Sequence, residues 1–361
     1  MPHQRPAPRS SYLLIDLLKI IAAQCIVWHH LALYGPLSEA LTQAAPELSK
    51  WLFDYARMAV QVFLVVAGYL AARSLGHSPL PAQGLLRTVW LRYARLVLPF
   101  LVALFVTMLV SAITRAHLDG DMVPEAPTLA QWLAHASLLH SVLGVDSLSA
   151  GVWYVAIDFQ LYALLALLLW LARGQAWLRV LLVAATACAS LVWFNLDAEY
   201  DAWALYFFGA YGLGALAWWA GLRSRHGGYA LALYFFTLLA GLGSLALEFR
   251  ERIALAMAVS SVLLAFGRTQ LRLPRALSPW VRRLSDASYA LFLVHFPVLL
   301  LLNAVWTALG LQDADTALAI VVAAWLLSLR LSHAFHVQVE QRIGRWRMRP
   351  VVQVVAVVTG E

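Results

Sequence analysis

Charged side chains are scarce in this chain of 361 residues. They make up 12% of the sequence, whereas hydrophobic side chains make up 62%. A soluble domain usually carries roughly 25% charged residues. The composition therefore excludes an ordinary water-soluble globule and predicts an integral membrane protein.

Cysteine and the common catalytic motifs are also scarce. Cys25 and Cys188 both lie in apolar runs, which argues against a structural disulfide or a zinc site. His333 and His336 are spaced i,i+3, but no carboxylate or cysteine ligand accompanies them in a convincing pattern, so no metal site is predicted. There is no Gly-rich phosphate loop and no G-x-S-x-G motif.

The sequence contains ten apolar runs that could each cross a membrane as a helix, which needs about 20 residues. We expect an all-α, polytopic membrane protein with spans at 12–34, 54–75, 94–114, 152–172, 177–195, 203–221, 229–247, 252–267, 286–309 and 316–338. The longest connection, 115–151, includes "LAQWLAHASLLHSVL", which is typical of an interfacial amphipathic helix. The predicted organisation is a basic tail at 1–11, one transmembrane domain at 12–340 and a second basic tail at 341–361.

The positive charges indicate the orientation. With the N-terminus in the cytoplasm, 19 of the 26 basic residues fall in inside segments, and the outside connections are acidic. Both termini are therefore expected in the cytoplasm. The net charge of +7 is explained by topology and by attraction to anionic lipid, so no nucleic-acid partner is expected.

The first span carries the ionisable residues Asp16, Lys19, His29 and His30. Such groups are costly at bilayer depth, so a functional role is the first hypothesis. Lys19 and His30 are eleven residues apart, which places them on one helical face about 16 Å apart, and Asp16 can pair with Lys19. A structural alternative carries equal weight: Asp16 and Lys19 form an ion pair, and His30 reaches the outer surface.

The fourth span carries Asp158, with Tyr154 and Tyr162 one turn away on either side. A carboxylate at the depth of His30 could orient the imidazole and stabilise its protonated form. The alternative is a hydrogen-bonded clasp between helices.

Arginines are predicted at the cytoplasmic side. Arg92 and Arg95 share a face just before the third span, where guanidinium groups could bind phosphate or simply anchor the helix. Arg330 in the tenth span could meet a phosphate or pair with Asp286.

The ninth span, in "LSDASYALFLVHFPVLL", contributes Tyr289 and His295. Pro297 is expected to bend this helix or loosen it locally. A histidine at this depth often makes a helix–helix hydrogen bond, so His295 is a weaker catalytic candidate than His30.

Five segments resemble the acyltransferase 3 family of integral membrane acyltransferases. Asp16, Lys19 and His30 resemble its Asp-x-x-Arg/Lys-x(10)-His pattern, and "RYAR" at 92–95 its R-x-x-R. "FLVVAGYL" at 63–70 resembles F-x-x-S-G-F/Y-L, with Ala67 in place of serine. "WYVAIDFQLY" resembles W-x-L-x-x-E-x-x-x-Y, with Asp158 in place of glutamate, and "SYALFLVHFP" resembles the closing S-Y-x-x-Y-L-x-H-x-P.

The resemblance covers about residues 12–340 and implies a function. It implies transfer of an acyl group, often acetyl, from cytoplasmic acyl-coenzyme A to a hydroxyl of a sugar, a cell-envelope glycan, a lipid-linked acceptor or another small molecule. It implies His30 as the catalytic residue, with Lys19 and the arginine pair serving the donor, in the cytoplasmic membrane of a bacterium. A transporter or flippase using intramembrane Asp, Lys and His is the alternative, and a sensor that has kept the fold without the chemistry is a third.

Overall fold

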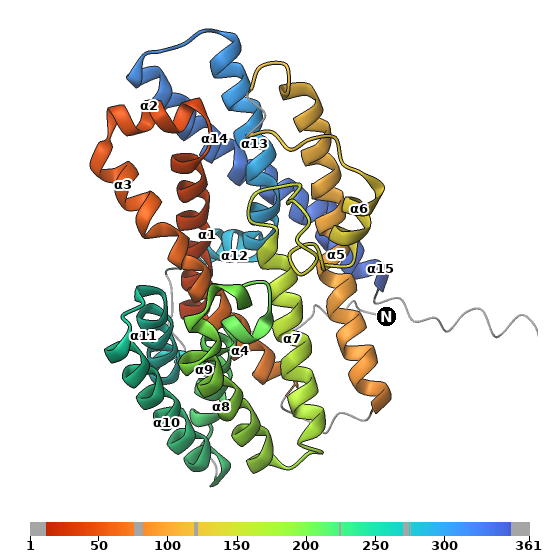
Figure 1. Ribbon diagram of the computed structural model, residues 1–361, viewed down its shortest axis with the longest axis vertical. Coiled ribbons are helices and arrows are strands. Elements are labelled where there is room, and N and C mark those ends of the chain that lie inside the picture. The colour runs from red at the N-terminus through yellow and green to blue at the C-terminus, as the bar shows by residue number, and fades with distance from the viewer. Residues whose placement is uncertain are drawn as a thin grey trace, which may run out of the picture.

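The fold is known from a computed structural model that describes residues 12–75, 82–118, 122–223, 225–269, 274 and 276–347. The predicted tail 1–11 and the part of the tail 341–361 beyond residue 347 lie outside these ranges. Within them every regular element is a helix (Figure 1). The all-α prediction is confirmed.

Each of the ten predicted spans coincides with a helix. These helices are α1 (Leu13–Leu33), α4 (Ala59–Leu75), α5 (Ala82–Thr114), α7 (Trp153–Leu171), α8 (Ala176–Val192), α9 (Ala204–Ala220), α10 (Arg225–Leu247), α11 (Glu251–Phe266), α13 (Ser288–Ala308) and α14 (Ala314–Phe335). Eight of the described segments are long and apolar enough to cross a membrane, whereas α9 and α11 have 17 and 16 residues. The chain is thus a multi-pass membrane protein, and the count of ten and the cytoplasmic termini stay predictions.

Short helices fill the connections. They are α2 (Pro36–Ala44), α3 (Pro46–Asp54), α6 (Leu129–Ala136), α12 (Ser278–Asp286), α15 (Gln341–Arg347), the 3-10 turns Ala56–Met58, Phe194–Leu196 and Ala198–Tyr200, and the π-helical turn His336–Glu340. Helices α2, α3 and α12 were not predicted from the sequence. Each has a proline in its first turn, where the missing N–H is not needed by the helix.

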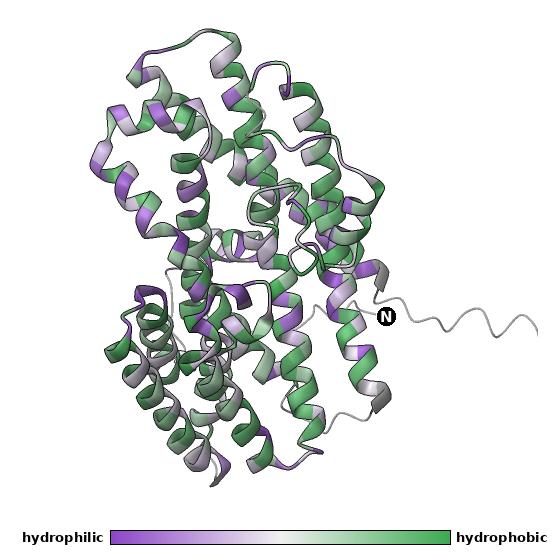
Figure 2. Ribbon diagram, in the orientation of Figure 1, coloured by the Kyte–Doolittle hydropathy of each residue, from purple (hydrophilic) through white to green (hydrophobic). Residues whose placement is uncertain are grey.

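Hydrophobic residues occur along most of the length of the long helices (Figure 2), and many large apolar side chains are exposed on the outside of the bundle. Phe105, Leu109 and Ile113 on α5 and Phe236 and Leu239 on α10 are all more than half exposed. Such faces are unfavourable in water and favourable against lipid chains. The bundle therefore presents to the membrane the surface that the composition predicts.

Two glycines let α4 and α9 pack with their backbones in close approach. A Cβ on Gly68 would lie 1.9 Å from the carbonyl oxygen of Tyr211, and one on Gly214 would lie 2.0 Å from that of Val65. Both positions therefore exclude any side chain. The glycine of "FLVVAGYL", Gly68, thus has a packing role. Its close contact with α9 holds Tyr211 inside the bundle, where its side chain is buried.

Helix α5 begins twelve residues earlier than predicted, so Arg92 and Arg95 lie inside it rather than before it. The connection after α5 turns back along this long helix. The hydroxyl of Tyr93 donates to the carbonyl of Ala136 in α6, and Phe100 packs on His135. Because Tyr93 is 21 residues from Thr114, α6 ends about 31 Å from the outer end of α5. The predicted amphipathic helix is thus shorter than expected and packs along α5.

A stacked histidine pair fixes this connection. His135 and His140 are both fully buried, with ring centroids 4.2 Å apart and planes 5° apart. His135 is hydrogen-bonded at both nitrogens, to the carbonyl of Gln131 and the N–H of Leu148. Both nitrogens of His140 lack a partner among the described residues. Burial and then His135 lower the pKa of His140 from 6.5 to about 4.

This lowered pKa predicts acid sensitivity of the fold. The unfolded chain takes up the proton first, so the free energy of unfolding should fall as pH drops from 6.5 to about 4 and level off below. His140→Phe keeps the ring stack and removes the two unpartnered nitrogens, so it should reduce the loss of melting temperature between pH 7 and pH 5 in detergent. His117→Phe, at an exposed site, is the control. Equal acid sensitivity of wild type and His140→Phe would contradict the assignment.

Candidate active site

His30 on α1 and His295 on α13 face one another across the bundle interior. Their exposed fractions are 8% and 2%. Nδ1 of His30 lies 2.6 Å from Nε2 of His295, with ring centroids 4.9 Å apart and planes 13° apart. The centroid separation is close to the nitrogen–nitrogen contact plus the two ring radii. The rings therefore meet edge to edge, with the hydrogen bond nearly in both planes.

The hydrogen bonds of this pair assign its protons. Nδ1 of His295 lies 3.1 Å from the carbonyl oxygen of Leu291, which can only accept, so this nitrogen carries the hydrogen. In a neutral ring Nε2 of His295 then accepts, and Nδ1 of His30 donates to it. The remaining nitrogen of His30, Nε2, is left with a free lone pair. The arrangement orients a base without using a carboxylate.

The surroundings of His30 leave this lone pair open. Nε2 of His30 forms no hydrogen bond with the described residues. It is also not one of the fully buried side-chain atoms that lack a partner, so it is not completely enclosed by the protein. The ring of Tyr34 stands edge-on to it at 5.5 Å. Gly151, with φ +74°, lies at the start of α7, and a Cβ there would come 3.4 Å from Cε1 of His30 and 3.2 Å from Phe292. The site therefore lies where α1, α13 and the start of α7 meet.

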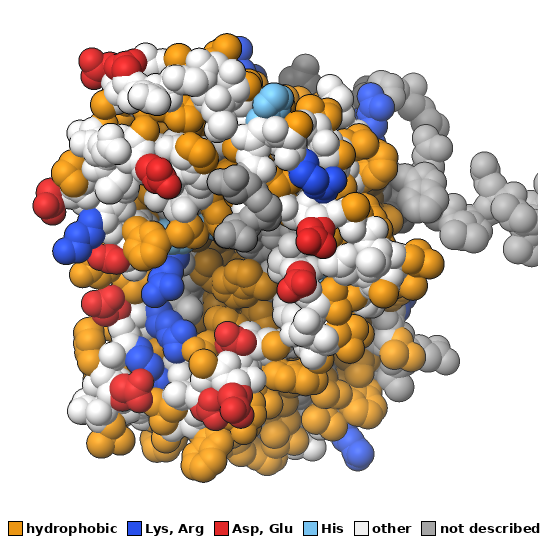
Figure 3. All heavy atoms as spheres, turned by 45° about the horizontal axis from the view of Figure 1, so that its top comes forward, with side chains coloured by type: hydrophobic (Ala, Val, Ile, Leu, Met, Phe, Trp, Pro, Cys, Tyr) orange, Lys and Arg blue, Asp and Glu red, His pale blue; other side chains and the backbone are white. Residues whose placement is uncertain are grey.

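The face turned forward in Figure 3 is hollowed at its centre. Hydrophobic side chains line the hollow, acidic side chains stand at several places around it, and lysine or arginine side chains border it on the left. This face combines an apolar recess with a charged rim, a form typical of a binding site for a small molecule.

Asp158 lies next to Arg92, and the prediction that it orients His30 is wrong. Its Oδ2 is 2.5 Å from a terminal nitrogen of Arg92, and the two side chains are 7% and 23% exposed. Asp158 follows Gly151 by seven residues, which places it about 10 Å further along α7 than His30. The prediction failed because the 115–151 connection was taken to lie outside, whereas it turns inward along α5.

Tyrosines surround the Arg92–Asp158 pair. The guanidinium carbon of Arg92 lies 5.0 Å from the ring centre of Tyr162. The hydroxyl of Tyr211 and Nε of Arg92 are buried and have no partner among the described residues. Tyr211 could not be predicted from the sequence, because it lies in an apolar run of α9 and its position depends on the glycine contact with α4. These unpartnered atoms make the pair a candidate for contact with a polar group of a ligand.

Two further predicted tyrosines, Tyr154 and Tyr289, have different surroundings. The ring of Tyr154 stands edge-on to Phe292 at 5.5 Å, next to the His30 pocket. The hydroxyl of Tyr289 donates to the carbonyl of Leu96 at 2.9 Å. Tyr154 therefore joins the site, whereas Tyr289 ties α13 to α5.

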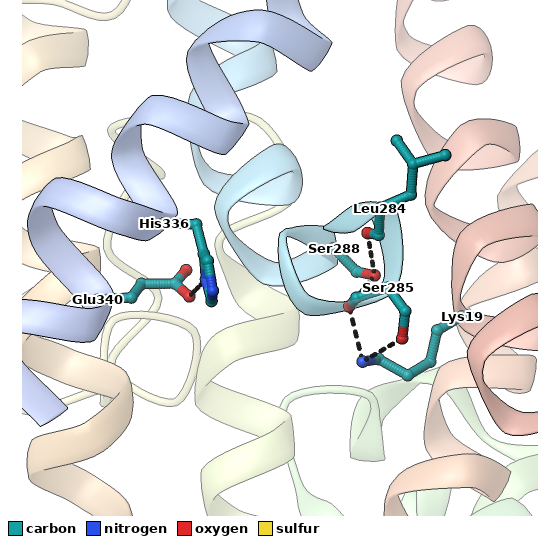
Figure 4. A network of polar contacts seen from close by, with 6 residues as sticks. All are labelled: Lys19, Leu284, Ser285, Ser288, His336 and Glu340. Atoms are coloured by element: carbon teal, nitrogen blue, oxygen red, sulfur yellow. Dashed lines mark hydrogen bonds and ion pairs between the residues drawn. The ribbon is translucent and has the colours of Figure 1, made fainter. Parts of the chain in front are cut away.

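Lys19 and Asp16 are joined through Ser285 of α12. Lys19 donates to the carbonyl of Ser285 at 2.7 Å and to its hydroxyl at 3.1 Å, and the hydroxyl donates to Asp16 at 2.6 Å. Figure 4 shows Lys19 reaching this serine, and Ser288 stabilises the same turn. The predicted direct pairing of Asp16 with Lys19 is therefore replaced by a serine bridge. Two of the three N–H groups of Lys19 thus have acceptors among the described residues, and the third is available to a ligand.

The π-helical turn after α14 adds an acid that the sequence analysis missed. His336 pairs with Oε2 of Glu340 at 2.7 Å, beside the Lys19 network (Figure 4). The other oxygen, Oε1, is buried without a partner among the described residues. Asp16, Asp286, Arg95 and Glu340 are the charged groups that act on the Lys19 ammonium. This end of the bundle thus has charges of both signs.

The predicted arginines differ in position. Arg95 is exposed and makes contacts within the described chain, unlike Arg92, which turns inward. Arg330 is exposed on α14 together with Leu326 and Leu327, and no described ion pair joins it to Asp286. The structure therefore does not bring Arg330 together with the other candidates.

Comparison with models of known protein families shows that residues 12–333 match the acyltransferase 3 model, which is described as an acyltransferase domain. The chain belongs to the acyltransferase 3 family. It is therefore a membrane acyltransferase, and the predicted membership is confirmed. The comparisons with curated proteins and with solved structures found no match.

The Arg92–Asp158 pair predicts a large effect of one substitution. Asp158→Asn leaves the Arg92 charge buried without its carboxylate, which typically costs about 3–5 kcal/mol. We expect a clearly lower melting temperature in detergent, whereas Asp158→Glu should keep the pair and most of the stability. Asp201→Asn, at an exposed carboxylate, is the control. An Asp158→Asn protein that melts like wild type would show that the pair contributes no net stability.

Proposed function

We propose that this acyltransferase moves an acyl group, most simply acetyl, from cytoplasmic acyl-coenzyme A to a hydroxyl of a sugar, an envelope glycan or a small molecule. The observation that carries the proposal is the open Nε2 lone pair of His30, oriented by His295 and Leu291. A base with one fixed tautomer is what proton abstraction from a hydroxyl requires. The family match supports the acyl chemistry.

In the proposed reaction the acceptor hydroxyl binds against Nε2 of His30. This nitrogen takes the hydroxyl proton while the oxygen attacks the thioester carbon. The C–S bond breaks, the acyl ester forms, and the leaving thiolate takes the proton from the His30 imidazolium to give the coenzyme thiol. His295 keeps its hydrogen bond to Nδ1–H of His30 throughout, so the imidazolium stays oriented.

The donor would enter from the end of the bundle that carries Lys19. Lys19 and His30 are about 16 Å apart along α1. The exposed Arg95 and the free N–H of Lys19 offer positive charge to the phosphates of coenzyme A. Arg92, neutralised by Asp158, would instead hold a polar group deeper in the passage, with Tyr154, Tyr162 and Tyr211 around it. Acceptors that enter the hollow seen in Figure 3 would meet the acyl group at His30. The protein would work in the cytoplasmic membrane of a bacterium.

Replacement of His30 tests this proposal. His30→Ala should lower acyl transfer from acetyl-coenzyme A by on the order of 10²–10⁴, the usual contribution of a general base. His29→Ala is the matched control, because His29 is also buried on α1 but bonds the carbonyl of Leu52. Transfer and donor hydrolysis are measured on purified protein. Full transfer by a folded His30→Ala protein would sink the proposal.

Replacement of His295 tests the orientation of the base. His295→Phe removes the acceptor of the His30 Nδ1–H bond, so either tautomer becomes accessible and kcat should fall, while KM for the donor changes little. His295→Gln offers a carbonyl oxygen to the same N–H and should recover part of the rate. The pH–rate profile should shift in the phenylalanine variant. A variant that only loses stability and keeps the wild-type kcat and pH profile would assign His295 a packing role.

A further inference from the structure

Two arginines from distant parts of the chain share one tryptophan at the end of the bundle that carries the arginine-rich connections. Arg73 lies in the last turn of α4, and Arg268 follows α11. Their guanidinium carbons are 5.8 Å and 4.1 Å from the ring centre of Trp218 on α9. Arg73 also lies 4.5 Å from the ring centre of Tyr12, before α1. Segments far apart in the sequence therefore bring two positive charges together.

Tyr69 lies beside the same tryptophan and close to both arginines. Its ring stands edge-on to Trp218 at 5.2 Å, and its side chain is 1% exposed. Arg268 shares a side-chain hydrogen bond with its hydroxyl, and Arg73 is close enough to act on this hydroxyl electrostatically. The Tyr69 hydroxyl and Nε of Arg268 have no other partner in the described chain. Buried polar groups are nearly always bonded, and an arginine N–H can only donate, so the O–H of Tyr69 is left to donate to a further acceptor.

The charge of the group is not balanced by the described residues. No carboxylate in the described ranges forms an ion pair with either arginine, and one terminal nitrogen of Arg268 donates to the Trp218 carbonyl. A guanidinium stacked on an aromatic ring keeps its edge N–H groups available for an oxyanion. Two such groups and a tyrosine hydroxyl together match the several acceptor oxygens of a phosphate.

We propose that Arg73, Arg268 and Tyr69 form a binding site for a phosphate group, separate from the Lys19 and Arg95 region. The phosphate could be that of an anionic phospholipid headgroup, for which basic pockets between membrane helices are suited, or that of a soluble phosphorylated nucleoside. The chemistry recognised is the same for both sources. The proposal does not depend on the role of His30, because it rests on a different group of residues.

The experiment measures binding by the full chain in detergent with two probes. One probe is short-chain phosphatidylglycerol, with phosphatidylcholine as its uncharged counterpart, and the other is adenosine 3′,5′-bisphosphate. The double variant Arg73→Gln/Arg268→Gln should bind the probe that wild type binds at least on the order of tenfold more weakly than wild type does. Arg283→Gln is the matched control, because Arg283 also stacks on a tryptophan, Trp280, but stands in no such group.

Tyr69→Phe keeps the test decisive if the double variant does not fold. Loss of a buried hydroxyl whose O–H has no acceptor among the described residues should change the melting temperature of the free protein little, while the affinity for the phosphate probe falls. Preference for phosphatidylglycerol would assign the site to lipid, and preference for the bisphosphate would assign it to a soluble ligand. The proposal would be overturned if Tyr69→Phe bound each probe as tightly as wild type does. It would also be overturned if Arg283→Gln lost as much affinity as the double variant.

Discussion

A polar side chain inside a membrane bundle must find its partner on another helix, and this constraint determines which helices of the chain meet at the site. Water is not available there to satisfy the group, so an unmatched donor or charge costs several kcal/mol. His30 finds His295, and Lys19 finds Ser285. Both partners belong to the segment formed by α12 and α13. One helix is thereby fixed against one other segment at two depths.

The register of these two contacts explains how the site is held. Lys19 and His30 are eleven residues apart, and their partners Ser285 and His295 are ten residues apart. Two segments that run in the same direction with nearly equal rise can satisfy both contacts at once. The spacing of Lys19 and His30 in the first span is therefore a structural requirement in its own right. A shift of one turn along α1 would break the lysine bridge and the histidine hydrogen bond together.

The sequence predicted which residues are polar at bilayer depth but not which of them meet. Hydropathy located all ten helices, and the spacing on α1 placed Lys19 and His30 correctly on one face. The pairing of Asp158 with Arg92 could not be predicted, because it depends on the inward path of the 115–151 connection, which no local pattern reveals. Tyr211 was missed for a similar reason: its position follows from the backbone contact at Gly68. Partners across a bundle are set by packing, which the order of residues in one helix does not contain.

The assignment of Asp158 to Arg92 changes what the base can be. A carboxylate beside His30 would add a negative charge to a buried site and would need its own compensation. A neutral histidine fixes the same tautomer through its hydrogen bond to Leu291 and leaves the resting pair uncharged. In the proposed reaction, charge then appears only during the chemical step, on the His30 imidazolium and on the oxygen and sulfur of the reacting groups. Because these opposite charges arise together and close to one another, their attraction strengthens toward the transition state, which is where stabilisation increases the rate.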